Sequence, residues 1–303
     1  MASLQSIFKL SESLAKPNEI TQTAIAFLRF IHSSRPTGFN HGVLKPSFCL
    51  ILKGEKQIQI GKEMKTYGPG DFLISTVEMP ASGRIRSAST RAPYLGLSIE
   101  IDPQEIMSIV TEAEIEFGTD TKLEQATPGA FISKSDAKVR KACTRLVELL
   151  SNPRPSKYLA QHIKREILYH LLTGKDASRF YQNVVTRQSE AGIGRAIRWI
   201  KANLDQPLRV AQLAEIAGMS VSGLHHKFKS ITTLGPLQYQ KQLRLVHARQ
   251  LLLSGAVNVA GAADKVGYLS QSQFTREYRR LFGESPVRDL KRLRQELKNV
   301  LQN

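Results

Sequence analysis

The C-terminal part of the chain contains one sequence pattern written twice. The first copy runs from Ala214 to Pro236 and the second from Ala263 to Pro286. Each copy begins with small apolar residues, breaks at a Gly, passes through a Ser, and then carries large apolar residues at i and i+4 followed by a basic residue. The copies are offset by 49 residues before the break and by 50 after it, so the second turn holds one additional residue.

This pattern predicts a short helix, a tight turn and a second helix. The Gly ends the first helix, and the Ser is a favoured N-cap for the second. A helix-turn-helix of this kind places its second helix in the major groove of DNA. A single copy would also suit an ordinary helical hairpin, but two copies at this spacing favour a DNA-binding domain.

Several stretches in and around the copies resemble the DNA-binding domain of the AraC/XylS family of bacterial transcription regulators, over about residues 193–293. The resemblance is carried by Pro207-Leu208, by Pro236-Leu237-Gln238-Tyr239-Gln240-Lys241-Gln242-Leu243-Arg244-Leu245 with Ala248-Arg249 and Leu251-Leu252, by Gly267-Tyr268 with Ser270, Ser272, Phe274 and Arg276, and by Gly283 with Ser285-Pro286. It implies a regulator whose partner is double-stranded promoter DNA and, for an activator, RNA polymerase.

The end of the first copy departs from this pattern. Aligning Pro236 with Pro286 places Thr233 where the second copy has Gly283. That site usually takes a positive φ at a helix C-terminus, which glycine adopts most easily. A β-branched Thr there predicts either a strained helix end or an exit that uses Gly235.

The composition favours two domains in a reducing cytoplasm. A length of 303 residues suits two domains better than one. The chain shows no signal-peptide pattern and no apolar run long enough to span a membrane, so a soluble, non-secreted protein without a membrane partner is expected. Its two cysteines, Cys49 and Cys143, exclude a disulfide framework and a Cys-rich zinc site.

Positive charge is concentrated in the C-terminal part. The net charge is +17, and residues 190–303 hold 18 Lys and Arg against 8 Asp and Glu. This excess favours a polyanionic partner. A positive surface that only keeps the protein soluble is the alternative, and the duplicated motif argues against it.

The N-terminal part is predicted to be an arm followed by a β-rich domain. Residues 1–35 show a helical pattern through Ile20, Ala24, Phe27, Leu28 and Ile31. From residue 38 to residue 102, short apolar or alternating runs are separated by turn residues, which suggests a small antiparallel barrel or sandwich. The predicted strands are 47–52, 56–60, 72–75, 84–86 and 94–101. Their order over residues 20–180 resembles the cupin-like sensor domain of the same family, in its AraC-type N-terminal branch.

Two helices are predicted to follow the strands. Residues 136–150 and 157–172 carry apolar stripes at helical spacing, and Pro153 and Pro155 separate them, which suggests an αα-hairpin. The stripes either cover the barrel or form a seam between two copies of the chain, so a homodimer remains open. Polar residues 174–176 and 186–192 mark a linker. The expected fold is therefore α+β, with a cupin-like β-barrel and helical hairpin in residues 1–185 and an all-α domain with two helix-turn-helix units in residues 186–303.

Seven helices are predicted in the C-terminal domain: 193–204, 210–217, 221–230, 236–253, 258–266, 271–282 and one that begins at Pro286. Trp199 is expected in the core, and the long central helix is expected to present Leu237, Leu243, Val246, Leu251 and Leu252 to both units. Base edges must be reached from the exposed N-terminal half of each recognition helix. The candidate base-reading residues are Ser222, His225, His226, Gln271, Ser272, Thr275 and Arg276, which also match the family's base-reading positions by resemblance. Solvent exposure or phosphate contact is the alternative for each.

Neighbouring basic residues suit the DNA backbone. Lys227, Lys229, Arg279 and Arg280 are expected to contact phosphates, which gives affinity without sequence choice. Leu224, Phe228, Phe274 and Tyr278 should form the core. Arg276 could donate two hydrogen bonds to guanine, and Gln271 could pair with adenine.

Catalytic and metal-binding patterns are missing from the sequence. His41 is the only histidine between residues 38 and 102, whereas a metal-binding barrel needs several converging ligands. No cofactor and no metal are therefore expected, and the protein is not expected to be an enzyme. A cupin-type enzyme fused to a DNA-binding module is one alternative, and a regulator whose barrel only dimerises, without an effector, is another.

A small-molecule effector in the barrel is the favoured prediction for the N-terminal domain. The candidate pocket residues are Phe48, Leu50, Phe72 and Tyr94, and each could equally be plain core. Cys49 lies in the same apolar run, so it is expected to be a small buried core residue. The alternative is a thiol that faces the pocket and reacts with an electrophilic or oxidising effector.

Overall fold

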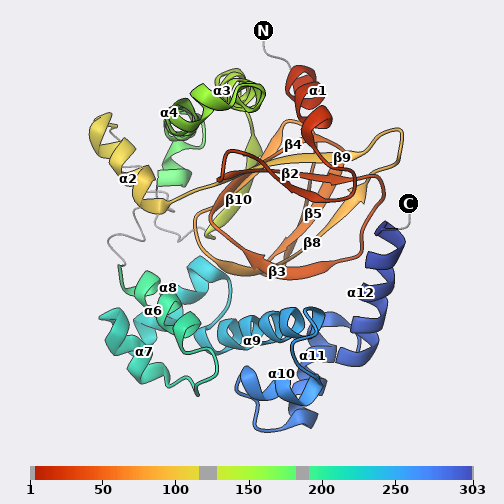
Figure 1. Cartoon of the computed structure of the whole chain (residues 1–303). Helices are drawn as coiled ribbons and strands as arrows, with labels where there is room; N and C mark the ends of the chain where they lie inside the picture. Colours follow the sequence, from red (N-terminus) through yellow and green to blue (C-terminus); the bar gives the residue numbers. More distant parts are fainter. Residues whose placement is uncertain (1–3, 116–127, 182–190, 302–303) are drawn as a thin grey trace. The chain divides into compact units, whose positions relative to one another are not determined.

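The chain forms two compact units in a computed structural model that describes residues 4–115, 128–181 and 191–301 (Figure 1). One unit comprises residues 1–40 and 44–189, and the other includes residues 190–303. The predicted boundary between residues 185 and 186, with residues 186–190 of the predicted linker, lies outside the described residues.

The N-terminal unit is built on two antiparallel sheets. The six-stranded sheet has the order β1 (Ile20–Gln22), β2 (Leu28–Ser33), β9 (Tyr94–Glu100), β4 (Ser47–Lys53), β7 (Asp71–Ser75) and β10 (Ala130–Lys134). The four-stranded sheet has the order β3 (Asn40–Leu44), β8 (Met79–Ser87), β5 (Glu55–Ile60) and β6 (Glu63–Tyr67). The five strands predicted within residues 38–102 are all present.

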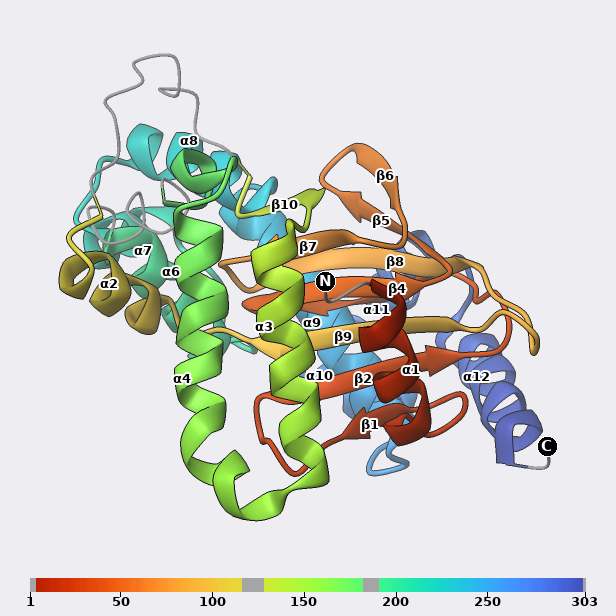
Figure 2. The same ribbon diagram turned by 90° about the horizontal axis from the view of Figure 1, so that it is seen from above.

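Helices cover one face of the six-stranded sheet. They are α1 (Leu4–Leu14), α2 (Pro103–Glu112), α3 (Ala137–Glu148), the short 3-10 helix η2 (Leu149–Ser151) and α4 (Pro153–Leu172). Figure 2 shows α1, α3 and α4 lying side by side across the strands. Because strand side chains alternate between faces, Phe48, Leu50 and Leu97 point into this helix-covered core together with Cys143 and Ile163. The predicted helical hairpin is confirmed as the cover of the sheet.

Two local predictions in this unit are wrong. Residues 20–22 and 28–33 form β1 and β2 rather than a helix, and in β2 the buried Leu28 and Phe30 alternate with less buried neighbours at the period of a strand. The N-terminal helix lies earlier, at α1. Pro153 does not separate α3 from α4 but begins α4, where its missing N–H breaks no helical hydrogen bond.

In residues 191–301 of the C-terminal unit all the regular elements are helices. They are α6 (Ala191–Ala202), α7 (Val210–Ala217), α8 (Val221–Thr232), α9 (Pro236–Leu253), α10 (Val259–Lys265), α11 (Gln271–Phe282) and α12 (Pro286–Leu301). These helices agree with the seven predicted from the sequence, within about two residues at most ends. The predicted α+β fold, with sheets and helices first and an all-helical double helix-turn-helix domain second, is confirmed.

Two side chains of the C-terminal unit differ from expectation. Leu237, predicted to face the core, is 50% exposed because it follows Pro236 in the first turn of α9. Trp199 is only half-buried on α6, whereas its neighbours Ile197 and Ile200 are buried. The other predicted core residues of α9 are buried or half-buried.

Candidate nucleic-acid interface

The turn and the helix start of each helix-turn-helix unit have matching geometry. Gly218 and Gly267 both adopt left-handed conformations, with φ of 67° and 79°. The Ser220 hydroxyl accepts a hydrogen bond from the Gly223 N–H at 3.1 Å, and the Ser270 hydroxyl accepts one from the Gln273 N–H at 3.3 Å. Both predicted N-caps are therefore formed, and each satisfies a backbone donor at the start of a recognition helix.

The two recognition helices, α8 and α11, have sharply divided faces. Leu224, Phe228, Phe274 and Tyr278 are fully buried, as predicted. The candidate base-reading residues lie on the opposite face, where Thr275 is half-buried and the others are exposed: Ser222, His225, His226, Gln271, Ser272 and Arg276. The phosphate candidates Lys227, Lys229, Arg279 and Arg280 are also exposed. Each helix thus offers a polar, basic surface on a rigid apolar support.

Glu277 is the only acidic residue on either recognition helix. Its carboxylate accepts hydrogen bonds from Lys241 Nζ at 2.9 Å and from the Tyr268 hydroxyl at 2.8 Å. Burial by itself would raise the pKa of Glu277, but these bonds and the Lys241 charge outweigh it and hold the pKa below its usual value. The one negative charge on these helices is therefore matched by a neighbouring cation.

A set of hydrogen bonds from α9 ties the two helix-turn-helix units together. We call it the α9 clamp; it consists of Gln240 and Arg244 with the carbonyls that they contact. Arg244 donates to the carbonyls of Leu204 at 2.6 Å and Gln206 at 2.9 Å, in the segment before α7, and to that of Gly267 at 3.0 Å, in the second turn. Gln240 donates to the Gln206 carbonyl at 2.8 Å.

Gln240 and Arg244 carry part of the family resemblance, but the sequence alone assigns them no role. The available signal was two polar residues at i and i+4 on a helix predicted to be apolar toward both helix-turn-helix units. A Cβ added to Gly267 would lie 2.0 Å from the Asp205 carbonyl oxygen, so the two segments also touch directly. The clamp therefore fixes the orientation of one helix-turn-helix unit relative to the other.

In the first helix-turn-helix unit, the C-terminal part of α8 packs through an aromatic pair and is followed by a residue with a strained backbone conformation. Phe228 of α8 meets Tyr239 of α9 edge to face, with ring centroids 5.2 Å apart. Thr233 takes the left-handed conformation with φ of 66°, and Gly235 does not, with φ of −70°. Of the two predicted exits from the helix, the strained one is therefore observed.

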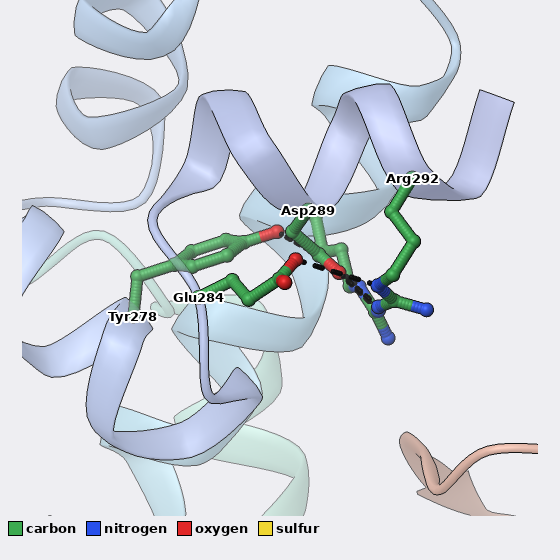
Figure 3. Close-up of polar contacts among 5 residues, drawn as sticks. Tyr278, Glu284, Asp289 and Arg292 are labelled. Carbon is green, nitrogen blue, oxygen red and sulfur yellow. Dashed lines mark hydrogen bonds and ion pairs between the residues drawn. The ribbon is translucent and has the colours of Figure 1, made fainter. Parts of the chain in front are cut away.

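The second helix-turn-helix unit adds a buried ionic network to its aromatic packing (Figure 3). Asp289 of α12 is fully buried and accepts hydrogen bonds from Arg249 Nε at 2.7 Å and from the Tyr278 hydroxyl at 2.8 Å. Arg292 also bonds to Asp289 and lies 3.4 Å from Glu284. Burial opposes ionisation of Asp289, but these donors and the Arg249 charge hold the pKa of Asp289 below its usual value. The network joins α9, α11 and α12.

The four effector-pocket candidates of the N-terminal unit do not lie together. Phe48, Leu50 and Phe72 belong to the helix-covered core, where the Phe48 and Phe72 rings are 5.1 Å apart. Tyr94 is buried on the opposite face of the sheet, and its hydroxyl lies over Gly96, where a Cβ would be 2.8 Å away. Strand alternation places Cys49 and Ser98 on that same face.

Cys49 is half-buried rather than packed among large apolar residues. Its thiol donates to the Ser98 hydroxyl at 3.4 Å. The Tyr67 hydroxyl is near Cys49 and Tyr94, and burial raises the pKa of Tyr67 well above its usual value. In the described part of the chain, no group forms a hydrogen bond with this buried hydroxyl. The sequence could not reveal this polar cluster, because its members come from three strands.

A cleft of about 730 Å³ opens beside the turn between β6 and β7, and Tyr67 is among the residues that line it. Its charged lining residues are Glu55, Asp71, Lys134 and Arg140, and none of the four predicted pocket residues lines it. Among residues 4–115, 128–181 and 191–301, no cluster of His, Cys, Asp and Glu is placed to hold a metal ion. No described helix is long and apolar enough to cross a membrane.

Comparison with known proteins gives the family. Residues 24–179 match the family described as AraC-type transcriptional regulator N-terminus, and residues 213–292 match a helix-turn-helix domain. ExsA from Pseudomonas aeruginosa is 23% identical over 79% of this chain and 84% of its own length. AlkR from Acinetobacter baylyi is 37% identical over 31% of each chain, and several other relatives match over only 30% to 36% of their length.

Solved structures show the same fold. An apo form of ToxT from Vibrio cholerae, solved as a single-substitution variant, superimposes with a TM-score of 0.54 at 11% identity, covering 91% of this chain and 98% of ToxT. Wild-type ToxT bound to an unsaturated fatty acid gives a TM-score of 0.50 at 12% identity, over 86% of this chain and 94% of ToxT.

The chain belongs to the AraC family of transcriptional regulators. The resemblance seen in the sequence is thereby confirmed. Membership of this family also decides against the enzyme alternative, because it makes the chain a helix-turn-helix regulator of transcription rather than a catalyst.

Proposed function

We propose that this protein binds double-stranded promoter DNA in a sequence-specific way and regulates transcription from it. The observation that carries the proposal is the pair of capped, basic helices α8 and α11, whose exposed faces hold the polar side chains suited to base edges. Their buried faces are packed, so these side chains stand on rigid supports. Rigid positioning lowers the entropy lost on binding.

Within this proposal the exposed residues divide into two roles. Ser222, His225 and His226 of α8 read bases in one major groove, and Gln271, Ser272, Thr275 and Arg276 of α11 read bases in the next. Lys227, Lys229, Arg279 and Arg280 contact phosphates and supply affinity that falls with added salt. The α9 clamp supports a single duplex contacted by both helices, in grooves about 34 Å apart.

Arg276→Ala tests base reading. The variant should lose preference at one base position, at a cost of about 1–3 kcal/mol, because a guanidinium can donate two bonds to guanine. The measurement is binding to single-base variants of a duplex selected from a random library by the full chain. Lys229→Ala is the matched control and should weaken binding to all sequences equally. Equal weakening by Arg276→Ala would assign Arg276 to a phosphate.

For the N-terminal unit we propose that a small molecule binds beside Tyr94, between the two sheets. The unpartnered Tyr67 hydroxyl supports this site, because a buried donor without a partner costs free energy that a polar ligand atom would recover. Phe48, Leu50 and Phe72 then lie on the other face of the sheet, where they support the site without contacting the ligand. That ToxT was solved with a fatty acid bound suggests that this fold can hold a small molecule.

The second candidate is a unit that only dimerises, through exposed residues of α4 such as Tyr158. Thermal unfolding of the full chain with a metabolite library separates the two candidates. A ligand that stabilises the wild type and fails to stabilise Tyr67→Phe supports the effector site. If no compound changes the melting temperature while the chain is a dimer by light scattering, dimerisation is favoured. For either candidate we propose a cytoplasmic protein, with RNA polymerase as a partner if it activates.

A further inference from the structure

The extra residue in the second turn has a defined place in the structure. The N–H groups of Met219 and Tyr268 donate to equivalent carbonyls, those of Ala214 and Ala263, both at 2.9 Å. Tyr268 therefore occupies the place of Met219, and Ser270 occupies that of Ser220 as N-cap. The residue without a counterpart is Leu269.

Leu269 contributes almost nothing to the folded unit. It is 105% exposed, which is more than any other large apolar residue among those described. Its two neighbours are held in place: the Tyr268 hydroxyl donates to Glu277, and the Ser270 hydroxyl accepts from Gln273. The backbone on both sides of Leu269 is therefore anchored, while its side chain is left exposed.

The surface around Leu269 suits DNA. Leu269 stands directly before the first turn of α11, beside the exposed side chains of Gln271 and Ser272. The nearest acidic residues in sequence are Asp264 and Glu277, and Glu277 is ion-paired with Lys241. The exposed Arg276, Arg279 and Arg280 therefore leave α11 with an excess of positive charge. A protein partner with an apolar groove would gain little from the cationic surroundings, whereas a nucleic acid is attracted by them.

One group on the major-groove edge of B-DNA is apolar, the 5-methyl group of thymine. We propose that Leu269 reads a thymine by packing its side chain against this methyl group, in the half-site contacted by α11. The inference rests on the proposed DNA binding and adds an apolar contact to the polar set of base-reading residues. Because the backbone around Leu269 is already anchored, little backbone entropy is lost when the contact forms.

The test removes the methyl group and the leucine separately. The full chain selects a duplex from a random library, and each thymine in the bound site is replaced in turn by deoxyuridine, which keeps the base pairing. At one thymine, wild-type affinity should fall roughly fourfold, the value of one buried carbon group. Leu269→Ala should bind the thymine duplex about fourfold more weakly than wild type and be indifferent to deoxyuridine at that position.

Two further variants make the result specific. Leu269→Met keeps an apolar side chain and should keep the response to deoxyuridine. Val287→Ala shortens another exposed apolar side chain, 65% exposed on α12, and should leave the response unchanged. The proposal is overturned if Leu269→Ala loses affinity equally for thymine and deoxyuridine duplexes, or loses none. If the chain selects no sequence at all, the proposed DNA-binding function fails instead.

Discussion

At the scale of single residues, Thr233 and Gly283 occupy the same position at the C-terminal ends of the two recognition helices, although one is β-branched and the other has no side chain. Both end a recognition helix in the left-handed region, with φ of 66° and 84°. The Thr232 hydroxyl supports the first helix end by donating to the Phe228 carbonyl at 2.8 Å and accepting from the Leu234 N–H at 3.3 Å. Those bonds offset the strain of a β-branched residue, which costs about 1–2 kcal/mol in this conformation.

Replacing Thr233 by Gly should therefore stabilise the C-terminal unit. The expected gain is about 0.5–1 kcal/mol, because the relief of strain exceeds the extra freedom that Gly adds to the unfolded chain. Fluorescence of Trp199, the only Trp, reports unfolding of this unit in urea. Gly283→Thr is the reciprocal variant and should destabilise by a similar amount. A loss of stability in Thr233→Gly would show that the Thr side chain makes contacts that outweigh its strain.

Asp289 gives the second helix-turn-helix unit a dependence on pH. Its folded-state pKa lies below the ordinary value near 3.9, so its ionised form stabilises the fold. This contribution is fully present above the unfolded pKa and is lost as pH falls through about 4 toward the folded pKa. Asp289→Asn should cost about 3–5 kcal/mol at pH 7, because it removes the carboxylate that neutralises the buried Arg249 charge.

Urea unfolding from pH 7 to pH 3 checks this prediction. The difference between wild type and Asp289→Asn should shrink as the pH falls below about 4, since the wild-type carboxyl is then also neutral. The exposed residue Asp264 on α10 supplies the control, because Asp264→Asn should change stability little at any pH. A pH-independent difference would mean that the introduced amide disturbs packing rather than charge.

At the scale of elements, the contact between residue 205 and residue 267 decides how the two helix-turn-helix units are joined. Gly267 and Gly283 both have positive φ, so alanine at either position pays the same conformational penalty of about 1 kcal/mol. Only at Gly267 would the new Cβ meet backbone, at 2.0 Å from the Asp205 oxygen, whereas nothing lies within 4 Å at Gly283. Gly267→Ala should therefore cost about 1–3 kcal/mol more than Gly283→Ala.

The same pair of variants also tests the role of the α9 clamp in DNA binding. Gly267→Ala pushes the second helix-turn-helix unit away from the first, so it should lose more affinity for a duplex with both half-sites than for one with a single half-site. Gly283→Ala leaves the clamp intact, so any loss of affinity should be the same for the two duplexes. Equal affinity losses for the two duplexes in both variants would mean that the clamp does not set half-site spacing. The measurement is a titration of each duplex at fixed salt.

At the scale of the whole molecule, we expect the C-terminal unit to act on its own. Residues 190–303 have their own buried core, caps and ion pairs. A fragment of these residues should fold by circular dichroism and bind DNA with an affinity that falls steeply with salt. Each lysine removed at Lys227 or Lys229 should reduce the slope of log affinity against log salt by about 1. An unfolded fragment, or one insensitive to salt, would contradict this expectation.

Much of the fold could be predicted because it depends on local pattern. In the two copies between Ala214 and Pro286, six helix ends could be predicted from a Gly break, a Ser cap or a Pro at N1. Each of these signals acts within one helical turn. Five of the six strands between Ser47 and Glu100 followed from apolar patterns and turn residues, whereas β6 was not predicted. In residues 20–31 the apolar spacing suits a helix and a strand alike. The strand forms at residues 28–33 because they pair with β9.

The exposed faces of the candidate interface were also visible in the sequence, since burial on an isolated amphipathic helix repeats every three to four residues. The sequence by itself therefore determined the order of the helices, the caps, and the side chains that α8 and α11 turn outward. Only the tertiary structure decided which segments meet: Arg244 with Leu204 and Gly267, Asp289 with Arg249, and the free position of Leu269. The physical reason is that capping and periodicity act between near neighbours in sequence, whereas these contacts join residues that only packing brings together.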